Sequence, residues 1–329
     1  MKALVTGSAG HLGEALMRTL TAQGDAVTGL DIVASPYTTE VGSVADREAV
    51  RLAMAGVEVV FHAATLHKPH VATHGRQDFI DTNLTGTLNL LEEAVAAGVR
   101  AFVFTSTTSV FGDALTPGAG ESAAWITEAV APQPKNIYGV TKAAAEDLCQ
   151  LFHRNQKLAV VVLRTSRFFP EPDDSATARA GHDDANLKAN EYLFRRIALE
   201  DVVSAHLRAA ERAGAIGFGK YIVSATSPFE LGDRAELRRD PAAVVARHVP
   251  AFAAEYARRG WTLPRDIGRV YVNAAARRDL GWAPVHDFAA VIARLAGGGE
   301  VLDPLARAVG AKGYHGDAFA GGLYPVDHA

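Results

Sequence analysis

Short apolar runs of strand length alternate with amphipathic segments of helical length along the first two thirds of the chain. Residues 1–6 form the first apolar run, and the helix expected at residues 14–23 has Leu16 and Leu20 on one face. The same pattern predicts strands at residues 27–31, 57–62, 102–106 and 158–164, and helices at residues 81–97 and 139–153. Because alternating strands and helices build a parallel sheet covered on both faces, we expect an α/β fold with a Rossmann-like, doubly wound parallel sheet.

The alternation loosens beyond Phe169. Residues 171–185 are acidic and rich in small residues, which predicts a loop, and residues 241–259 predict a helix pair or one broken helix. We expect a Rossmann domain at residues 1–169, to which segments around 195–225 return, a smaller, mainly substrate-binding region at 170–295, and a glycine-rich tail at 296–329.

Composition narrows the class of protein. The 329 residues carry a formal net charge of -4 and contain no basic tract, so nucleic acid is not an expected partner. No apolar run approaches membrane-spanning length, and the chain enters a strand at once, so we expect no membrane association and no signal peptide. The single cysteine, Cys149, rules out an internal disulfide and favours a cytoplasmic location.

A glycine-rich loop, Thr-Gly-Ser-Ala-Gly-His-Leu-Gly at residues 6–13, joins the first strand to the first helix. This strand–turn–helix setting is what a dinucleotide-binding fingerprint requires. The first glycine permits the tight turn, the second lets the backbone approach a pyrophosphate, and the third lets helix and strand pack closely. The expected cofactor contacts in the loop are Gly7, Gly10, His11, Leu12 and Gly13.

Asp31 ends the second predicted strand. A carboxylate at this place bonds the adenosine ribose hydroxyls and repels a 2′-phosphate. No arginine follows in residues 32–34, so the sequence favours NAD over NADP.

Tyr138 and Lys142 are four residues apart in a predicted helix and therefore share one face. A lysine ammonium beside a phenol favours the phenolate, so we expect Lys142 to lower the pKa of Tyr138. Tyr138 would then exchange a proton with a substrate hydroxyl or carbonyl near neutral pH. With the dinucleotide loop, the pair indicates nicotinamide-dependent redox chemistry at a carbon that bears oxygen.

Three histidines, His67, His70 and His74, follow the strand at residues 57–62. Their spacing is compatible with zinc, but no cysteine or other fourth ligand accompanies them, and the chemistry needs no metal. We expect no metal site and assign His70 and His74 to a polar loop over the mouth of the active site.

The chain resembles the extended short-chain dehydrogenases/reductases of the NAD-dependent epimerase/dehydratase family over about residues 1–295. The resemblance rests on the glycine-rich loop, Asp31, His62-Ala63-Ala64, DTNLTGT at 81–87, TSTTSVFG at 105–112, Tyr138-Gly-Val-Thr-Lys142, Leu163-Arg164 and LGWAP at 280–284.

The resemblance implies further cofactor contacts. Asn83 would support the geometry of the cofactor and the active site. Ser43 and Val44 stand where relatives contact adenine; Ser43 replaces the usual acid, which leaves adenine to the Val44 backbone or to Asp46. The positions implied at the nicotinamide end are Ala63, Ala64, Tyr138 and Lys142.

The resemblance also implies a catalytic hydroxyl five residues before Gly112. That position is Thr107, with Ser106 and Thr108 as neighbouring alternatives, so the expected catalytic residues are Thr107, Tyr138 and Lys142. Sugar-nucleotide dehydratases of the family carry Asp-Glu directly after this threonine. Thr108 and Ser109 stand there and cannot act as an acid–base pair at neutral pH, which argues against a dehydratase.

Several departures from the family pattern favour a substrate smaller than a nucleotide sugar. Arg167 replaces the phosphate-binding asparagine of the epimerases, and their later arginine is displaced to Arg195. His67 matches a substrate-facing lysine of some epimerases. The expected substrate contacts are His67, Thr108, Arg167 and Arg195.

Three activities are compatible with these motifs. We favour an NAD-dependent oxidoreductase acting on a secondary alcohol or ketone of a sugar-like small molecule. The alternatives are a nucleotide-sugar (UDP-hexose type) 4-epimerase that retains its NAD, and a catalytically silent NAD-sensing protein, against which the intact Tyr138–Lys142 pair argues. In relatives the helices at residues 81–97 and 139–153 pair across a dimer, which implies a homodimer.

Overall fold

Seven parallel strands form the main sheet, in the order β3-β2-β1-β4-β5-β7-β8. The computed structural model describes residues 1–173 and 175–313. The strands are β1 (Lys2–Thr6), β2 (Ala26–Asp31), β3 (Glu40–Val41), β4 (Val59–His62), β5 (Ala101–Thr107), β7 (Val160–Thr165) and β8 (Phe218–Val223). This topology confirms the predicted α/β class and the Rossmann-like sheet.

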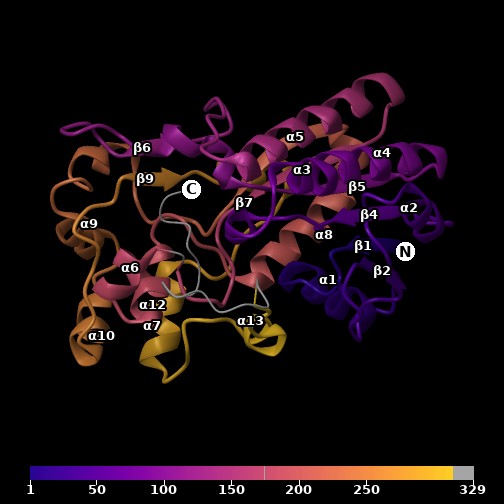
Figure 1. The fold of residues 1–329 in the computed structure, drawn as a ribbon. Coiled ribbons are helices and arrows are strands. Elements are labelled where there is room, and N and C mark those ends of the chain that lie inside the picture. The colour runs from indigo at the N-terminus through magenta and orange to yellow at the C-terminus, as the bar shows by residue number, and fades with distance from the viewer. Residues whose placement is uncertain (174, 314–329) are drawn as a thin grey trace.

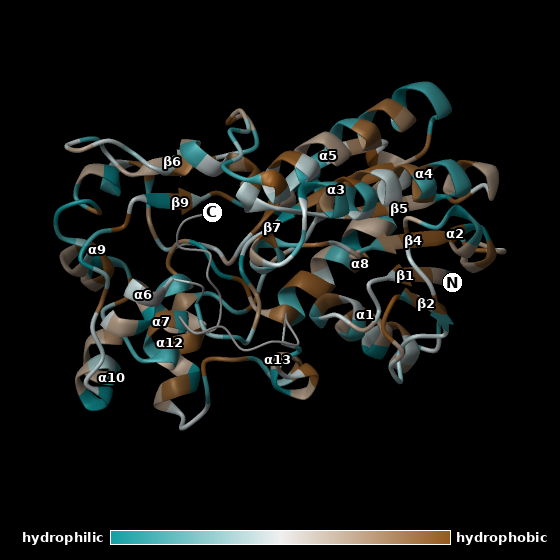
Figure 2. Ribbon diagram, viewed as in Figure 1, coloured by the Kyte–Doolittle hydropathy of each residue, from teal (hydrophilic) through white to brown (hydrophobic). Residues whose placement is uncertain are grey.

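Helices cover both faces of the sheet because successive strand residues point to opposite sides. Ala3 and Val5 of β1 belong to one core, whereas Leu4 belongs to the other. The first core is covered by α1 (His11–Ala22) and α8 (Leu199–Ile216); the second is covered by α2 (Arg47–Ala53), α4 (Gly86–Ala96) and α5 (Ile137–Gln156) (Figure 1). The buried strands are accordingly apolar along their length (Figure 2).

The helix predicted at residues 81–97 is longer than expected and changes its winding. It begins as α3 (Arg76–Phe79), widens into the π-helical segment η2 (Ile80–Thr85) and continues as α4. A π-helical segment inserts an extra residue into the turn and is frequent at functional sites. Here it contains Asn83, whose carbonyl accepts a hydrogen bond from the Thr87 hydroxyl at 2.7 Å.

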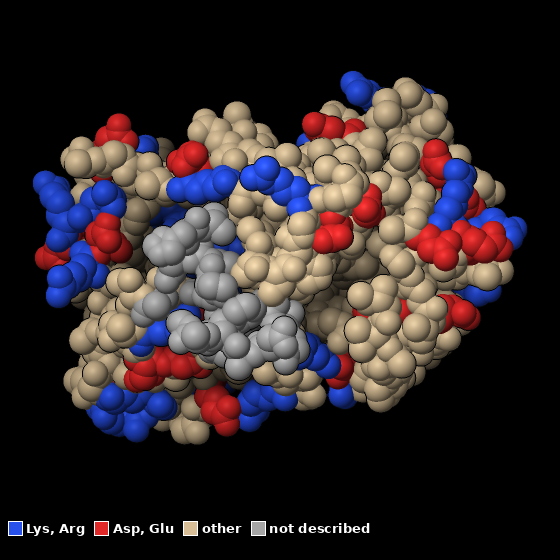
Figure 3. Space-filling view, viewed as in Figure 1, with Lys and Arg blue, Asp and Glu red and all other residues tan. Residues whose placement is uncertain are grey.

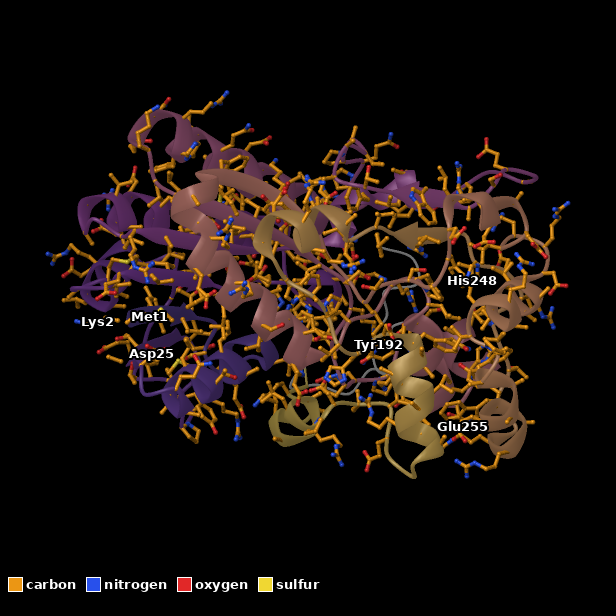
Figure 4. The ribbon with its side chains drawn as sticks, turned by 180° about the vertical axis from the view of Figure 1, so that it is seen from behind. Met1, Lys2, Asp25, Tyr192, His248 and Glu255 are labelled. Atoms are coloured by element: carbon orange, nitrogen blue, oxygen red, sulfur yellow. The ribbon has the colours of Figure 1, made fainter. Side chains whose placement is uncertain are left out.

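A second lobe follows the sheet. Its core is formed around α7 (Asp184–Glu191), α9 (Pro241–His248), α10 (Phe252–Arg259) and α12 (Phe288–Ala296), with Tyr192 buried among them (Figure 4). Residues 241–259 thus form the helix pair. A short parallel pair, β6 (Ala124–Ile126) and β9 (Arg269–Tyr271), borders this lobe.

The loop expected at residues 171–185 is instead partly helical. Ser175 caps α6 (Ala176–Gly181), and Asp183 caps α7 by accepting a hydrogen bond from Asn186 N at 2.7 Å. The side-chain oxygens of these residues satisfy backbone donors that would otherwise be unpaired, so a polar sequence begins a helix here.

Late segments return to the Rossmann core. Residues of α11 (Ala274–Leu280), such as Ala276 and Leu280, and of α13 (Pro304–Val309), such as Ala306 and Val309, belong to the same core as α1 and α8. The part of the expected tail at residues 314–329 lies outside the described residues.

Charged side chains of both signs are interspersed over the face drawn in Figure 3, and at the edge of the sheet the Met1 ammonium lies 2.6 Å from Asp25 (Figure 4). No helix in the described part of the chain is long and apolar enough to cross a membrane.

Candidate active site

A cavity of about 520 Å³ opens at the carboxyl ends of the central strands. The strand order reverses between β1 and β4, and open α/β sheets bind ligands at such a switch point. The expected cofactor positions that line this cavity are Gly7, Gly10, His11, Leu12, Gly13, Asp31, Ser43, Val44, Ala63, Ala64 and Tyr138.

The glycines of the loop have different roles. Gly7 has φ +71°, which favours glycine, and a Cβ there would lie 2.8 Å from Ala64 N. A Cβ on Gly13 would lie 1.8 Å from the Gly7 carbonyl oxygen, so the close packing predicted at Gly13 occurs against the loop itself. A Cβ on Gly10 would meet only the Gly7 oxygen, at 3.3 Å. A side chain at position 10 would therefore occupy part of the cavity without disturbing the packing of the fold.

The start of α1 suits an anion. Its N-cap residue is Gly10, which makes no side-chain capping hydrogen bond, and the first N–H groups of a helix have no partner within the helix. The helix dipole adds partial positive charge at the same place. The loop and the helix start therefore fit the pyrophosphate of a dinucleotide.

Asp31 is held at the rim of the cavity by two backbone donors. Ala9 N bonds one carboxylate oxygen at 2.9 Å, and Val33 N bonds the other at 2.9 Å. Of the described residues lining the cavity, Lys312 alone is a lysine or arginine, and it pairs with Glu14. A 2′-phosphate would meet the Asp31 carboxylate without a compensating cation, which agrees with NAD.

Of the two groups expected to recognise adenine, the Val44 backbone and Asp46, only Val44 lies at the cavity. The Asp46 carboxylate caps α2 by accepting a hydrogen bond from Glu48 N at 2.9 Å, and Asp46 does not line the cavity. Asn89 Nδ2 donates to the Val44 and Ala45 carbonyls, each at 3.1 Å. Val44 thus stays at the cavity with its carbonyl already engaged.

Asn83 lies behind the cavity and ties two of its walls together. Its Oδ1 accepts from Leu66 N at 2.9 Å, and its Nδ2 donates to the Leu66 carbonyl at 2.9 Å and to Thr141 Oγ1 at 3.1 Å. The loop after β4 is thereby fixed to α5 one residue before Lys142. These hydrogen bonds are compatible with the role expected for Asn83, which is to maintain the geometry of the cofactor and active site.

His62 is a buried structural histidine. The Thr87 hydroxyl donates to the Asn83 carbonyl, so it accepts from His62 Nε2, 3.0 Å away, and Nδ1 then accepts from the Thr6 hydroxyl at 2.8 Å. Burial and the charge of Lys142 hold the pKa of His62 well below its usual range. The network assigns a neutral ring with its proton on Nε2.

A second cavity, of about 230 Å³, adjoins the first. Tyr138, Phe168 and Phe169 line both, so the phenol lies where the two cavities meet. The expected catalytic and substrate positions that line the second cavity are Thr107, Tyr138, His67, Thr108, Arg167 and Arg195.

Thr107 is the hydroxyl that accompanies Tyr138. Its hydroxyl accepts from Ser109 N at 3.1 Å, and its side chain lowers the pKa of the phenol. Ser106, one alternative, instead donates to Glu146 at 2.6 Å. Thr108, the other, lines the second cavity.

Lys142 does not lower the pKa of Tyr138 in this structure, contrary to our expectation. Burial raises the pKa of Tyr138 to about 12, and the Thr107 side chain offsets only part of this effect. The Lys142 ammonium lies 4.0 Å from the centroid of the Phe104 ring, and burial lowers its pKa to about 7. Four-residue spacing places both residues on one helix face but does not direct the lysine head group at the phenol.

Sequence motifs missed several lining residues. Phe168 and Phe169 follow β7, and the rule that ligands bind at carboxyl ends of parallel strands could have indicated them. Arg269 and Tyr271 come from a distant segment with no local signal, and only the tertiary structure brings them to the site.

Comparison with known proteins finds a family model that matches most of the chain. The model of the NAD dependent epimerase/dehydratase family matches residues 3–220. A solved structure of a short-chain dehydrogenase/reductase superfamily protein from Agrobacterium tumefaciens with bound NAD has a TM-score of 0.63 and 23% identity, covering 90% of this chain and 98% of that one. At this identity the likeness concerns the fold.

Two curated relatives carry steroid or sterol names. A 3-beta-hydroxysteroid dehydrogenase of Mycolicibacterium neoaurum is 26% identical over 328 residues, covering 86% of this chain and 87% of the relative. The sterol demethylase protein B of Methylococcus capsulatus is 35% identical over 155 residues, covering 44% of this chain and 45% of the relative. The chain spans less than half the length of two of the curated relatives it matches.

Gly13→Ala and Gly10→Ala should separate folding from cofactor binding. The methyl group that Gly13→Ala adds would overlap the Gly7 carbonyl, so we expect a loss of about 1–3 kcal/mol in the free energy of unfolding. Gly10→Ala should keep the stability and weaken NAD binding, because its Cβ would enter the cavity. Urea unfolding and calorimetric NAD titration measure both; equal stability losses would contradict this division.

Lys142→Met should stabilise the protein at neutral pH. The folded pKa of about 7 lies below the ordinary 10.5, so the unfolded chain binds more protons between these values and stability rises with pH there. Removing the ammonium should add a few kcal/mol at pH 7, since each unit of pKa shift corresponds to about 1.4 kcal/mol. Urea unfolding of both proteins at pH 7 and 10 should show the gap closing as pH rises. A variant less stable than the parent at pH 7 would contradict the account.

Proposed function

Because the chain belongs to the NAD-dependent epimerase/dehydratase family and is an enzyme of short-chain dehydrogenase/reductase chemistry, we propose that it oxidises a secondary alcohol, or reduces the corresponding ketone, of a small sugar-like molecule. One observation carries this proposal. Tyr138, a buried proton donor and acceptor, lies where a cavity suited to a dinucleotide meets a smaller cavity lined by polar side chains.

The residues of the site have separate tasks. NAD, when bound, takes up or returns the hydride. Tyr138 accepts the proton of the substrate hydroxyl during oxidation and donates it to the carbonyl oxygen during reduction. Thr107 lines the same cavity as Tyr138, lowers the pKa of the phenol, and would hydrogen-bond the substrate oxygen. Asp31, the glycine-rich loop and the start of α1 would hold the cofactor.

The second cavity argues for a compact polar substrate. Its volume of about 230 Å³ is below the roughly 300–1,000 Å³ of sites for drug-sized ligands, which disfavours a nucleotide sugar. No carboxylate occurs among its described lining residues, so an elimination of the dehydratase type would lack its acid–base pair. The basic side chains in its wall equally disfavour the fused hydrocarbon rings named for the sterol-related relatives.

One feature favours the epimerase alternative. The segment after α13 reaches the rim of the dinucleotide cavity, where Lys312 N donates to Glu171 at 2.8 Å and the Lys312 ammonium pairs with Glu14. A segment held there would slow cofactor exchange, and an epimerase keeps its NAD through turnover.

A homodimer through α5 is part of the proposal. Val140 and Leu151 are 47% and 38% exposed, and their eleven-residue separation places them on one face of the helix. An apolar stripe of this kind fits the helix pairing implied by the resemblance. A cytoplasmic location stays a prediction from the single cysteine.

Tyr138→Phe should leave NAD affinity nearly unchanged and lower kcat by about 10²–10⁴. Because burial raises the pKa of Tyr138 to about 12, alcohol oxidation by the parent enzyme should accelerate about tenfold per pH unit above neutrality, while the variant should lack this slope. Tyr221→Phe, at a buried tyrosine that lines neither cavity, is the matched control. Full activity in Tyr138→Phe would overturn the assignment.

The NAD(H) released by denaturing the purified protein distinguishes the two activities. We expect little bound nucleotide and reversible binding of added NAD, as for a dehydrogenase. Near-stoichiometric nucleotide per chain would favour the epimerase.

A further inference from the structure

The wall of the second cavity is strongly basic. Lys68, Arg167, Arg195 and Arg269 line it, and no aspartate or glutamate does so within residues 1–173 and 175–313. A cavity with this lining attracts an anion. The partners of the three arginines show which of them is available to a ligand.

Two of the arginines are already engaged. Arg195 lies 2.5 Å from Asp173 and 2.6 Å from Glu191. Arg167 donates to the Pro172 carbonyl at 2.7 Å and lies 3.9 Å from both carboxylates. Burial of Asp173 opposes ionisation, but the two arginines outweigh it and hold the pKa of Asp173 at about 2. Arg167 and Arg195 therefore hold the segment after β7 in place, with their charges balanced.

Arg269 is different. Its guanidinium forms no ion pair or hydrogen bond with any part of the chain that the structure describes, although the residue is half-buried. The nearest acid in the sequence, Asp266, is paired with Arg238 instead. An arginine keeps its charge at all accessible pH values, so the charge of Arg269 is available to an anion that enters the cavity.

The backbone fixes where Arg269 points. It pairs with Ala124 in the β6–β9 ladder, and side chains alternate along a strand, so Arg269 and Tyr271 share one face while Val270 enters the core of the second lobe. Both Arg269 and Tyr271 line the cavity. Their strand holds them in position without a loop rearrangement.

A second polar group in the cavity also lacks a partner. Ser166 Oγ is buried, the residue being 2% exposed, and makes no hydrogen bond to any residue the structure describes. An unsatisfied buried hydroxyl costs free energy, so Ser166 adds an unpaired polar group beside the cavity.

We propose that Arg269 binds an anionic group of the substrate, a carboxylate or a phosphate monoester, while Tyr138 acts on a hydroxyl-bearing carbon of the same molecule. This proposal rests on the proposed function and narrows its substrate class to monosaccharide-sized acids or phosphate esters. The planar guanidinium matches either group with two parallel hydrogen bonds. Since Tyr138 and Arg269 line one cavity of about 230 Å³, the anion and the reacting carbon belong to one small molecule.

Matched substrate pairs test the proposal. With NAD, the full chain is assayed by NADH absorbance on D-glucuronate, D-galacturonate and D-glucose 6-phosphate, each against its neutral parent hexose. We expect kcat/KM on one anionic member to exceed that on its parent by about 100-fold, and Arg269→Gln to remove that excess mainly through KM. A preference for the acids would identify the anionic group as a carboxylate, and a preference for the phosphate ester would identify it as a phosphate.

Two further variants control the result. Arg265→Gln removes an exposed arginine of the same segment that does not line the cavity, and should have no effect. Arg269→Lys keeps the charge without the planar fork and should give an intermediate loss. Preference for neutral sugars, or equal losses on acid and parent, would overturn the proposal.

The failure of this proposal is separable from that of the proposed function. If neutral sugars are turned over and Tyr138→Phe abolishes that activity, the redox assignment stands and the role of Arg269 falls. If no compound is turned over, thermal unfolding of the NADH-saturated protein is measured with each anion. Stabilisation lost in Arg269→Gln but kept in Arg265→Gln supports the anion site, and its absence overturns it.

Discussion

Removal of a phenol and an ammonium from water is the constraint on which the active site depends. Tyr138 and Lys142 are both buried because α5 packs its Ala145–Cys149–Phe152 side against the sheet. Burial penalises the charged form of each group, so the phenol holds its proton and the ammonium releases its own more readily. The site thus favours the neutral form of both groups, and the fold supplies the free energy that this requires.

The two cavities divide recognition between the lobes. The larger is built from the carboxyl ends of the central strands, whose order is imposed by the doubly wound topology. The smaller gains Arg269 and Tyr271 from a two-stranded pair at the border of the second lobe. The residues for cofactor binding and proton transfer therefore lie at the sheet, whereas residues that would determine substrate specificity come from segments outside the main sheet.

The sequence predicted the parts of the molecule that local physics determines. Apolar runs and helical periods gave the sheet, and the glycine spacing gave a loop whose Gly7 has a positive φ and whose Gly13 admits no side chain. Two things escaped. The direction of the Lys142 head group depends on packing against Phe104, which spacing along a helix does not encode. The helices at residues 176–191 begin at polar capping residues, and a polar composition alone reads as a loop.

The packing of α13 against α1 makes the cofactor lobe discontinuous in the chain. Val309 and Ala306 complete the same core as Leu16 and Leu20, and Lys312 meets Glu14 beside the glycine-rich loop. During synthesis, nearly three hundred residues are therefore added after α1 before α13, which completes its packing, leaves the ribosome. A fragment ending after β7 would contain every nucleotide-binding motif and still expose an apolar face, so the lobe that binds the cofactor is not a unit that can be cut out of the sequence.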